Sequence, residues 1–281
     1  MNLPRPPACF LFDNGSLRAA STLSLRRVAA ALAARAGREV TGVSLQHSNR
    51  VPAEELGGEP AQLLEPALRE FLAAEPAGAA DLLPLFFGPS AALSEQVPDR
   101  MAELSRQFPA ACLRLARSLV DPAAPDDRRV ARMLADQVRS AAQTVGWRRP
   151  KVLLVDHGSP TRAVTAVRDL LGGQLRAELV DEAEAVGVAS MERRAGVEHD
   201  FNEPLLATAL RCPPFRDGEV VVALQFLSPG RHAGPGGDIA AICRAAEAEQ
   251  PALRTWMTEP LGAHPLLLDV LADRLAAAQE E

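Results

Sequence analysis

The 281-residue sequence contains no tyrosine, and its aromatic residues amount to only 4% of the chain. Proteins that bind single-stranded nucleic acid stack bases on aromatic side chains, and such platforms are scarce here. The formal net charge is −6, and no basic stripe offsets it. These two deficits argue against nucleic acid as a partner.

Cysteine is sparse, and no stretch is strongly hydrophobic. The four cysteines are far apart and form no CxxC pair, so a zinc ribbon or an iron–sulfur cluster has no support. We expect reduced, mostly buried thiols at Cys9, Cys112, Cys212 and Cys243. No segment approaches the roughly 20 apolar residues of a membrane helix, and the first apolar run is too short for a signal peptide. The sequence therefore predicts a cytoplasmic protein with no membrane partner.

Short apolar runs alternate with segments of helical periodicity, which predicts an α/β fold. Apolar residues make up 47% of the chain and charged residues 23%, the balance of a globular protein. In the first half we predict strands over 9–12, 39–45, 81–87 and 112–115, and helices near 17–36, 62–74, 94–106 and 126–142.

The second half repeats the order of the first. Asp13-Asn14-Gly15-Ser16 corresponds to Asp156-His157-Gly158-Ser159, and Met133-Leu134-Ala135-Asp136 to Val270-Leu271-Ala272-Asp273. This repeat predicts two lobes, 1–147 and 148–281, each a mostly parallel sheet of about four strands flanked by helices. A cleft between the lobes is the expected ligand site.

His157 follows a predicted buried strand over 152–156, and Pro160 can open the next helix. The residue therefore lies at the carboxyl end of a parallel strand, where open α/β sheets bind ligands. A lone histidine there is more often structural. The first lobe, however, has Asn14 at the matching position and no counterpart of His232 or His264, and this asymmetry favours function.

His232 follows the next long predicted strand, 219–227, and should lie at the same sheet edge. Two neutral imidazoles form a half-site for a borderline divalent metal, and they leave coordination positions open for an incoming ligand. The alternative for His232 is a solvated loop residue. The glycines of 234–237 lack GxGxxG and GK[ST] patterns, so they indicate a flexible loop or room for a flat ligand rather than a phosphate site.

Three motifs in this order resemble those of the ATP-independent (class II) chelatases. They are a strand followed by HGSP, a strand followed by SPGRH and DI, and the segment TEPLGAHPLLLDVLADR. Within these the sequence is most similar to the CbiX/SirB-type sirohydrochlorin chelatases of cobalamin and sirohaem synthesis. The resemblance covers most of the second lobe and extends weakly over the first. It implies a two-lobed chelatase-like fold, insertion of Co²⁺ or Fe²⁺ into sirohydrochlorin, and metal-binding and catalytic roles for His157 and His232.

Metallation of a tetrapyrrole requires the loss of two pyrrole protons and of metal-bound water. One neutral histidine can accept a proton while the other binds the cation. The metal (Co²⁺, Fe²⁺ or Ni²⁺) is then a substrate, and no tightly bound cofactor is expected. Glu192 or Glu203 can supply a third contact, with an exposed helix-start carboxylate as an equal alternative for each. Ser159, at a helix start, is another substrate-binding candidate. Arginines can pair with substrate carboxylates, and the candidates are Arg162, Arg193, Arg194 and Arg231. His264 is a further candidate, for which a packing or capping role is equally expected.

Two other functions stay open at this point. A protein with a chelatase-like scaffold can carry a tetrapyrrole or a metal without catalysis. The first lobe, which lacks counterparts of His157, His232 and His264, motivates that alternative. An unrelated α/β enzyme acting on phosphorylated substrates rests only on helix N-termini at strand ends. The sequence leaves the metal and the oligomeric state open.

Overall fold

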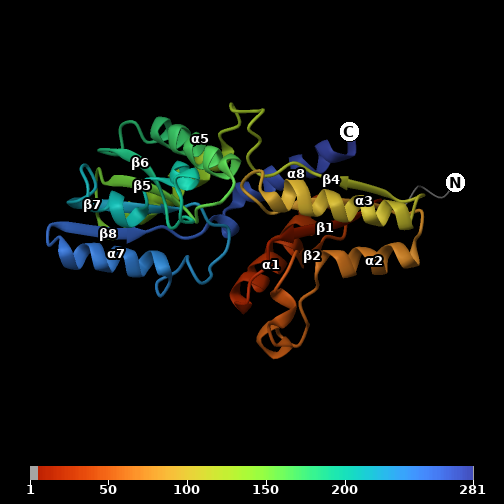
Figure 1. Ribbon diagram of the computed structural model, residues 1–281. Coiled ribbons are helices and arrows are strands. Elements are labelled where there is room, and N and C mark those ends of the chain that lie inside the picture. Colours follow the sequence, from red (N-terminus) through yellow and green to blue (C-terminus); the bar gives the residue numbers. More distant parts are fainter. Residues whose placement is uncertain (1–5, 281) are drawn as a thin grey trace. The chain divides into compact units, whose positions relative to one another are not determined.

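The computed structural model describes residues 6–280, which form two compact units (Figure 1). The first unit contains the residues up to Asp121 together with those from Leu267 onward, and the second runs from Pro122 to Leu266. Each unit contains one four-stranded sheet in which every pair of neighbouring strands is parallel. The predicted α/β class and the two parallel sheets are confirmed.

In the first unit the strand order is β2-β1-β3-β4. Its elements are β1 (Ala8–Asp13), α1 (Ala19–Ala36), β2 (Thr41–Ser44), α2 (Leu64–Ala74), β3 (Ala79–Pro84), a π-helical turn (Ala92–Gln96), α3 (Val97–Gln107), β4 (Cys112–Leu115) and, from the end of the chain, α8 (Pro265–Glu280). The predicted strands and helices lie within a few residues of these bounds.

In the second unit the order is β6-β5-β7-β8, which is the same topology. Its elements are α4 (Arg129–Val145), β5 (Lys151–Asp156), α5 (Arg162–Glu178), β6 (Val186–Ser190), α6 (Leu206–Ala209), β7 (Gly218–Leu224), α7 (Asp238–Glu249) and β8 (Leu253–Met257). Every residue of β5 is buried, as the apolar run predicted.

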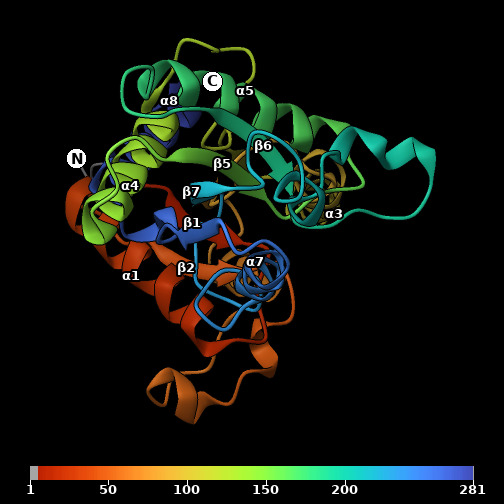
Figure 2. The same ribbon diagram turned by 90° about the vertical axis from the view of Figure 1, so that its left-hand side faces the viewer.

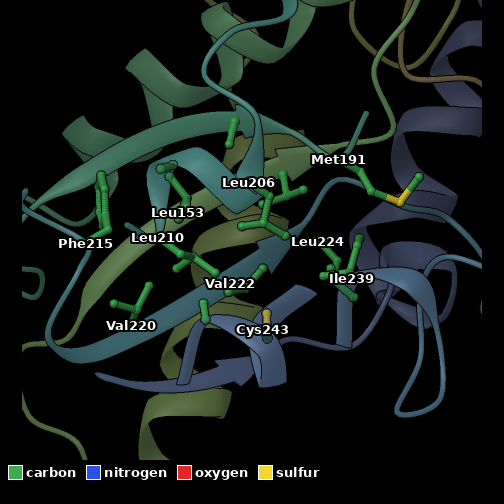
Figure 3. Packing of buried hydrophobic residues seen from close by; sticks show 14 of the residues in the cluster. Leu153, Met191, Leu206, Leu210, Phe215, Val220, Val222, Leu224, Ile239 and Cys243 are labelled. Atoms are coloured by element: carbon green, nitrogen blue, oxygen red, sulfur yellow. The ribbon is translucent and has the colours of Figure 1, made fainter. Parts of the chain in front are cut away.

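One face of the second sheet packs against α6 and α7. Alternate residues of β5 and β7, including Leu153 and Val222, meet Leu206, Ile239 and Cys243 in a single apolar cluster (Figure 3). On the opposite face, α4 packs beside α5 and against β7 (Figure 2). Strands covered by helices on both faces read as continuous apolar runs, and this burial fixes the carboxyl ends of β5 and β7 as neighbours.

The compact units differ from the predicted lobes 1–147 and 148–281 because each repeat gives its last helix to the other sheet. Helix α4 belongs to the second unit, although it is encoded in the first repeat. Helix α8 belongs to the first unit, where Arg274 donates to the Ser118 carbonyl (2.9 Å) and Asp269 pairs with Arg35 of α1. The pattern of apolar residues in a helix does not show which sheet the helix covers. The predicted boundary at 147/148 therefore separates the two repeats, whereas the compact units divide after Asp121 and after Leu266.

The thiols depart in part from expectation. All four cysteines are free, and Cys9 and Cys243 are buried as predicted, with burial raising their thiol pKa values to about 12 and about 11. Cys112 and Cys212 are exposed, because one begins the edge strand β4 and the other lies in the turn after α6. Within residues 6–280, no helix combines the length and the apolar character that crossing a membrane requires.

The turn after the first strand of each sheet is built in the same way. Gly15 and Gly158 have φ values of +89° and +90°, a region that L side chains rarely adopt. A Cβ on Gly15 would lie 1.7 Å from the Gln46 carbonyl oxygen, and one on Gly158 would lie 1.9 Å from that of Glu192. Both glycines are therefore required by the close approach of the chain that follows the second strand.

Asp13, at the end of β1, makes the stability of the first unit depend on pH. Its side chain accepts a hydrogen bond from the Ser44 hydroxyl (2.6 Å), but burial dominates and raises its pKa to about 6. Because the folded pKa lies above the unfolded one, the folded state binds more protons, and stability falls as pH rises from about 4 through 6. Asp13→Asn should remove this loss, which is on the order of 2–3 kcal/mol. Urea unfolding followed by circular dichroism between pH 4 and 8 measures it, and parallel profiles for both proteins would contradict the assignment.

Candidate functional site

His157 projects from the turn immediately after β5. Its Nδ1 lies 3.1 Å from the carbonyl oxygen of Gly158. A carbonyl oxygen only accepts, so this contact is a hydrogen bond in the tautomer with its proton on Nδ1, in which Nε2 has a free lone pair. The side chain is 46% exposed, so that lone pair is accessible to a ligand.

His232 lies in the loop between β7 and α7, and a carboxylate fixes its orientation. Its Nδ1 is 2.7 Å from Oδ2 of Asp238, the first residue of α7. Backbone bonds hold the loop against the helix start, since Ile239 N–H donates to the His232 carbonyl (3.3 Å). A Cβ on Gly237 would lie 2.5 Å from that same carbonyl oxygen, so this glycine serves the close packing of the loop rather than room for a flat ligand.

The two imidazoles lie together at the carboxyl edge of the sheet. Their ring centroids are 4.6 Å apart, with an interplanar angle of 68°. Each Nδ1 faces a protein acceptor, which leaves two Nε2 atoms for a shared ligand. Glu192 follows β6, and its Oε1 is 3.6 Å from Nε2 of His157. Within residues 6–280, no three His, Cys, Asp or Glu side chains are grouped closely enough to enclose a metal, so the pair is an open half-site.

Asp156 lies beneath this pair, at the last position of β5. It is 4% exposed, and neither carboxylate oxygen has a hydrogen-bond partner in the described part of the chain. Burial raises its pKa, and the neighbouring Ser190 hydroxyl and the positive charge of Arg168 oppose that shift. The floor of the site therefore contains a weakly solvated acid.

Three other predicted residues make contacts within the surrounding loops. The Ser159 hydroxyl accepts from Thr161 N–H (3.0 Å), which is a local contact just before α5. Arg162 stacks over the Phe201 ring, 4.7 Å from its centroid. Glu203 accepts from Arg193 (2.8 Å) and from Leu205 N–H (2.9 Å).

Arg231 and His264 differ in their access to solvent. The Arg231 side chain is 74% exposed and lies 3.5 Å from Asp238, next to the histidine pair. His264 is nearly buried. Its Nδ1 accepts from Leu266 N–H (3.3 Å) and its Nε2 lies 3.5 Å from Asp136, which are the contacts of a capping and packing residue.

The first unit has the same turn with different chemistry. Asn14 and Gln46 occupy the places of His157 and Glu192: Gln46 N–H donates to the Asn14 carbonyl (3.3 Å), and Glu192 N–H donates to that of His157 (3.1 Å). The two side-chain amides are 3.5 Å apart. A carboxamide pair is a poor ligand set for a borderline divalent metal, which prefers imidazole. The sequence repeat showed that Asn14 is equivalent to His157, but the equivalence of Gln46 and Glu192 is visible only in the structure.

Sequence reasoning also missed Arg168 and Asn202. Both are buried, with exposures of 2% and 0%, and they tie the 197–202 turn to α5 and to the turn after β5. Arg168 stands within a helix whose apolar spacing indicates only a core face. No sequence pattern marks either residue.

Comparison with known proteins agrees with this arrangement. The family model described as CbiX matches residues 151–278. SirB from Bacillus subtilis with Fe³⁺ superposes with a TM-score of 0.69 at 14% identity, covering 98% of this chain and 96% of that one. SirB from Bacillus subtilis subspecies spizizenii with cobalt gives 0.66 at 13% identity, with the same coverage. CbiX, the terminal enzyme of sirohaem biosynthesis in denitrifying bacteria, gives 0.58 at 20% identity and covers 97% and 99%. No curated protein sequence matches.

The two parallel four-stranded sheets, with paired histidines at one sheet edge, define the fold class as that of the two-lobed class II chelatases. The CbiX family model matches the second repeat, and the fold of the chain is that of the SirB and CbiX structures.

Proposed function

We propose that this protein inserts a divalent metal, Co²⁺ or Fe²⁺, into sirohydrochlorin, with His157 and His232 as metal ligand and proton acceptor. The observation that carries the proposal is the pair of imidazoles 4.6 Å apart at the carboxyl edge of the second sheet. That sheet belongs to the repeat that matches the CbiX family.

The metal, as substrate, is held first. His157 Nε2 and the Glu192 carboxylate, 3.6 Å apart, offer one nitrogen and one oxygen donor on the same side of the site. Both side chains are about half-exposed, so water and the macrocycle can occupy the remaining coordination positions. Such an open site lets the ion leave for the tetrapyrrole, which a closed four-ligand site would prevent.

His232 then accepts one of the two pyrrole protons at Nε2, and the second proton leaves to water on the open side of the site. The Asp238 carboxylate at Nδ1 stabilises the imidazolium that forms, because the hydrogen bond becomes charge-assisted on both sides. The Gly158 carbonyl behind His157 carries no such charge, so proton acceptance is assigned to His232 and metal binding to His157. Arg231, exposed beside Asp238, can pair with a carboxylate of the macrocycle.

An absorbance assay tests the proposal directly. Purified protein is mixed with sirohydrochlorin and each of Co²⁺, Fe²⁺ and Ni²⁺, and the spectral change of the macrocycle is followed against the same mixture without protein. Acceleration by catalytic amounts of protein is expected for Co²⁺ or Fe²⁺. Rates equal to the protein-free rate for every metal would refute the activity.

Asp238→Asn is expected to lower the insertion rate by about 10- to 100-fold, since the charge behind His232 is lost while the side-chain shape is kept. Steady-state rates with the preferred metal measure the effect. Glu198→Gln is the matched control, because Glu198 faces His199 (3.9 Å) rather than the pair. An equal loss in both variants would remove the special role of Asp238.

One observation favours a second candidate, a protein that carries a tetrapyrrole or a metal without turnover. The equivalent position in the first unit has the amide pair Asn14 and Gln46, whereas the second unit has the histidine pair there. Stoichiometric binding of sirohydrochlorin without accelerated metallation would support this function over catalysis.

A further inference from the structure

One peptide group connects the buried part of the second unit to His157. The carbonyl oxygen of Gly158 lies 3.1 Å from Nδ1 of His157, and the N–H on the other side of the same peptide, that of Ser159, donates to Oδ1 of Asn202 (2.9 Å). A trans peptide is planar, so fixing the direction of the N–H also fixes that of the carbonyl. The orientation of the Gly158 carbonyl in turn decides whether His157 Nδ1 has an acceptor.

We propose that Asn202 is a positioning residue for His157, acting through the Gly158–Ser159 peptide to direct Nε2 at the ligand. This role rests on the proposed function, since it gives Asn202 a part in metal binding. Asn202 also donates through Nδ2 to the Ser159 carbonyl (2.9 Å), so it holds both polar groups of that residue. Two-point attachment restrains rotation of the turn, which a single bond does not.

Asn202 is itself held by three residues, two at its carboxamide and one at its backbone carbonyl. Thr165 of α5 donates its hydroxyl to Asn202 Oδ1 (3.2 Å), and Asn202 Nδ2 also donates to the His199 carbonyl (3.0 Å). Arg168 donates to the Asn202 carbonyl (2.9 Å) and to the Ser190 hydroxyl at the end of β6 (2.6 Å). Asn202 is fully buried. A satisfied buried network of this kind rigidifies the groups it contains.

The first unit provides the comparison. There Ser16 N–H donates to the Ser48 hydroxyl (3.2 Å), a single bond in the place of the Asn202 clamp. Helix α1 has Leu25 in its buried face, and the partly buried Arg38 pairs with Asp81. The turn therefore folds with one serine where no histidine has to be oriented. The two-point clamp and the buried Arg168 occur in the repeat that carries His157.

The experiment compares Asn202→Ala with Ser48→Ala, because each deletes the acceptor of the turn N–H in its own unit. Co²⁺ titration of the full chain, followed by visible absorbance, measures metal affinity and coordination. We expect Asn202→Ala to weaken Co²⁺ binding about tenfold and to change the spectrum. Ser48→Ala should lower the melting temperature while leaving Co²⁺ binding within about twofold of wild type. Asn202→Ser, which introduces the residue used by the first unit, gives a milder variant should the alanine protein not fold.

A second readout separates this proposal from the proposed function. Nuclear Overhauser contacts between the ring protons of His157 and His232 report their edge-to-face approach, with centroids 4.6 Å apart, without any metal, and Asn202→Ser should weaken them. If wild type binds Co²⁺ but does not metallate sirohydrochlorin, the enzyme function fails while the positioning role is still tested. Unchanged Co²⁺ affinity and unchanged ring contacts in the Asn202 variants would overturn the positioning role, whatever the activity of wild type.

Discussion

Replacing His157 with alanine is expected to reduce metal insertion on the order of a thousandfold, and replacing His232 should do the same. Loss of His157 removes the nitrogen donor that faces Glu192, and loss of His232 removes the base stabilised by Asp238. The two variants should differ in binding: His157→Ala loses Co²⁺ binding, whereas His232→Ala keeps part of it. Steady-state rates with sirohydrochlorin and equilibrium Co²⁺ titrations measure the two effects.

The fold should survive both substitutions, because the side chains are 46% and 27% exposed and their truncation leaves no sealed cavity. The matched control is His47→Ala, an exposed histidine of the first unit, which should retain the wild-type rate. The double variant should be no slower than the slower single variant, since the two rings act in one event. Wild-type rates in both single variants would end the assignment of this pair.

Local patterns in the sequence were sufficient for the sheets. The apolar run before His157 predicted a buried strand, and the repeat of Asp13–Ser16 in Asp156–Ser159 predicted a second sheet of the same order. Together they place His157 and His232 at one edge, because consecutive parallel strands end on the same side.

The sequence did not predict the contacts that depend on which helix covers which sheet. Helices α4 and α8 have equivalent patterns, and each covers the sheet of the other repeat. The sequence also does not show which of Glu192 and Glu203 lies near His157. Both follow β6 in the chain, but backbone hydrogen bonds keep residue 192 beside His157, whereas Glu203 binds Arg193.

The exchange of terminal helices makes the first unit depend on the end of the chain, and Asp81 is where that dependence concentrates. Asp81 lies on β3 and is fully buried. It pairs with Arg38 (3.2 Å) and Arg114 (2.7 Å), and Gln279 of α8 donates to it (2.7 Å). One carboxylate therefore neutralises two arginines and anchors the last turns of a helix that is distant in sequence.

Asp81→Ala is expected to destabilise the first unit by about 3–5 kcal/mol, because it leaves two partly buried guanidinium groups without a counter-charge. Urea unfolding followed by far-ultraviolet circular dichroism measures the loss. The matched control is Glu249→Ala, which breaks the exposed pair with Arg211 (2.7 Å) and should barely move the midpoint.

Tryptophan fluorescence distinguishes the two units in the same titration, since Trp147 and Trp256 both lie in the second. If Asp81 acts on the first unit, the dichroism of the variant should fall at lower urea than its fluorescence changes. Coincident transitions, displaced together by the substitution, would mean that the two units unfold as one. The anchoring of α8 by Asp81 would then support the histidine-bearing sheet as well as its own, because a cooperative transition transmits a local loss to the whole chain.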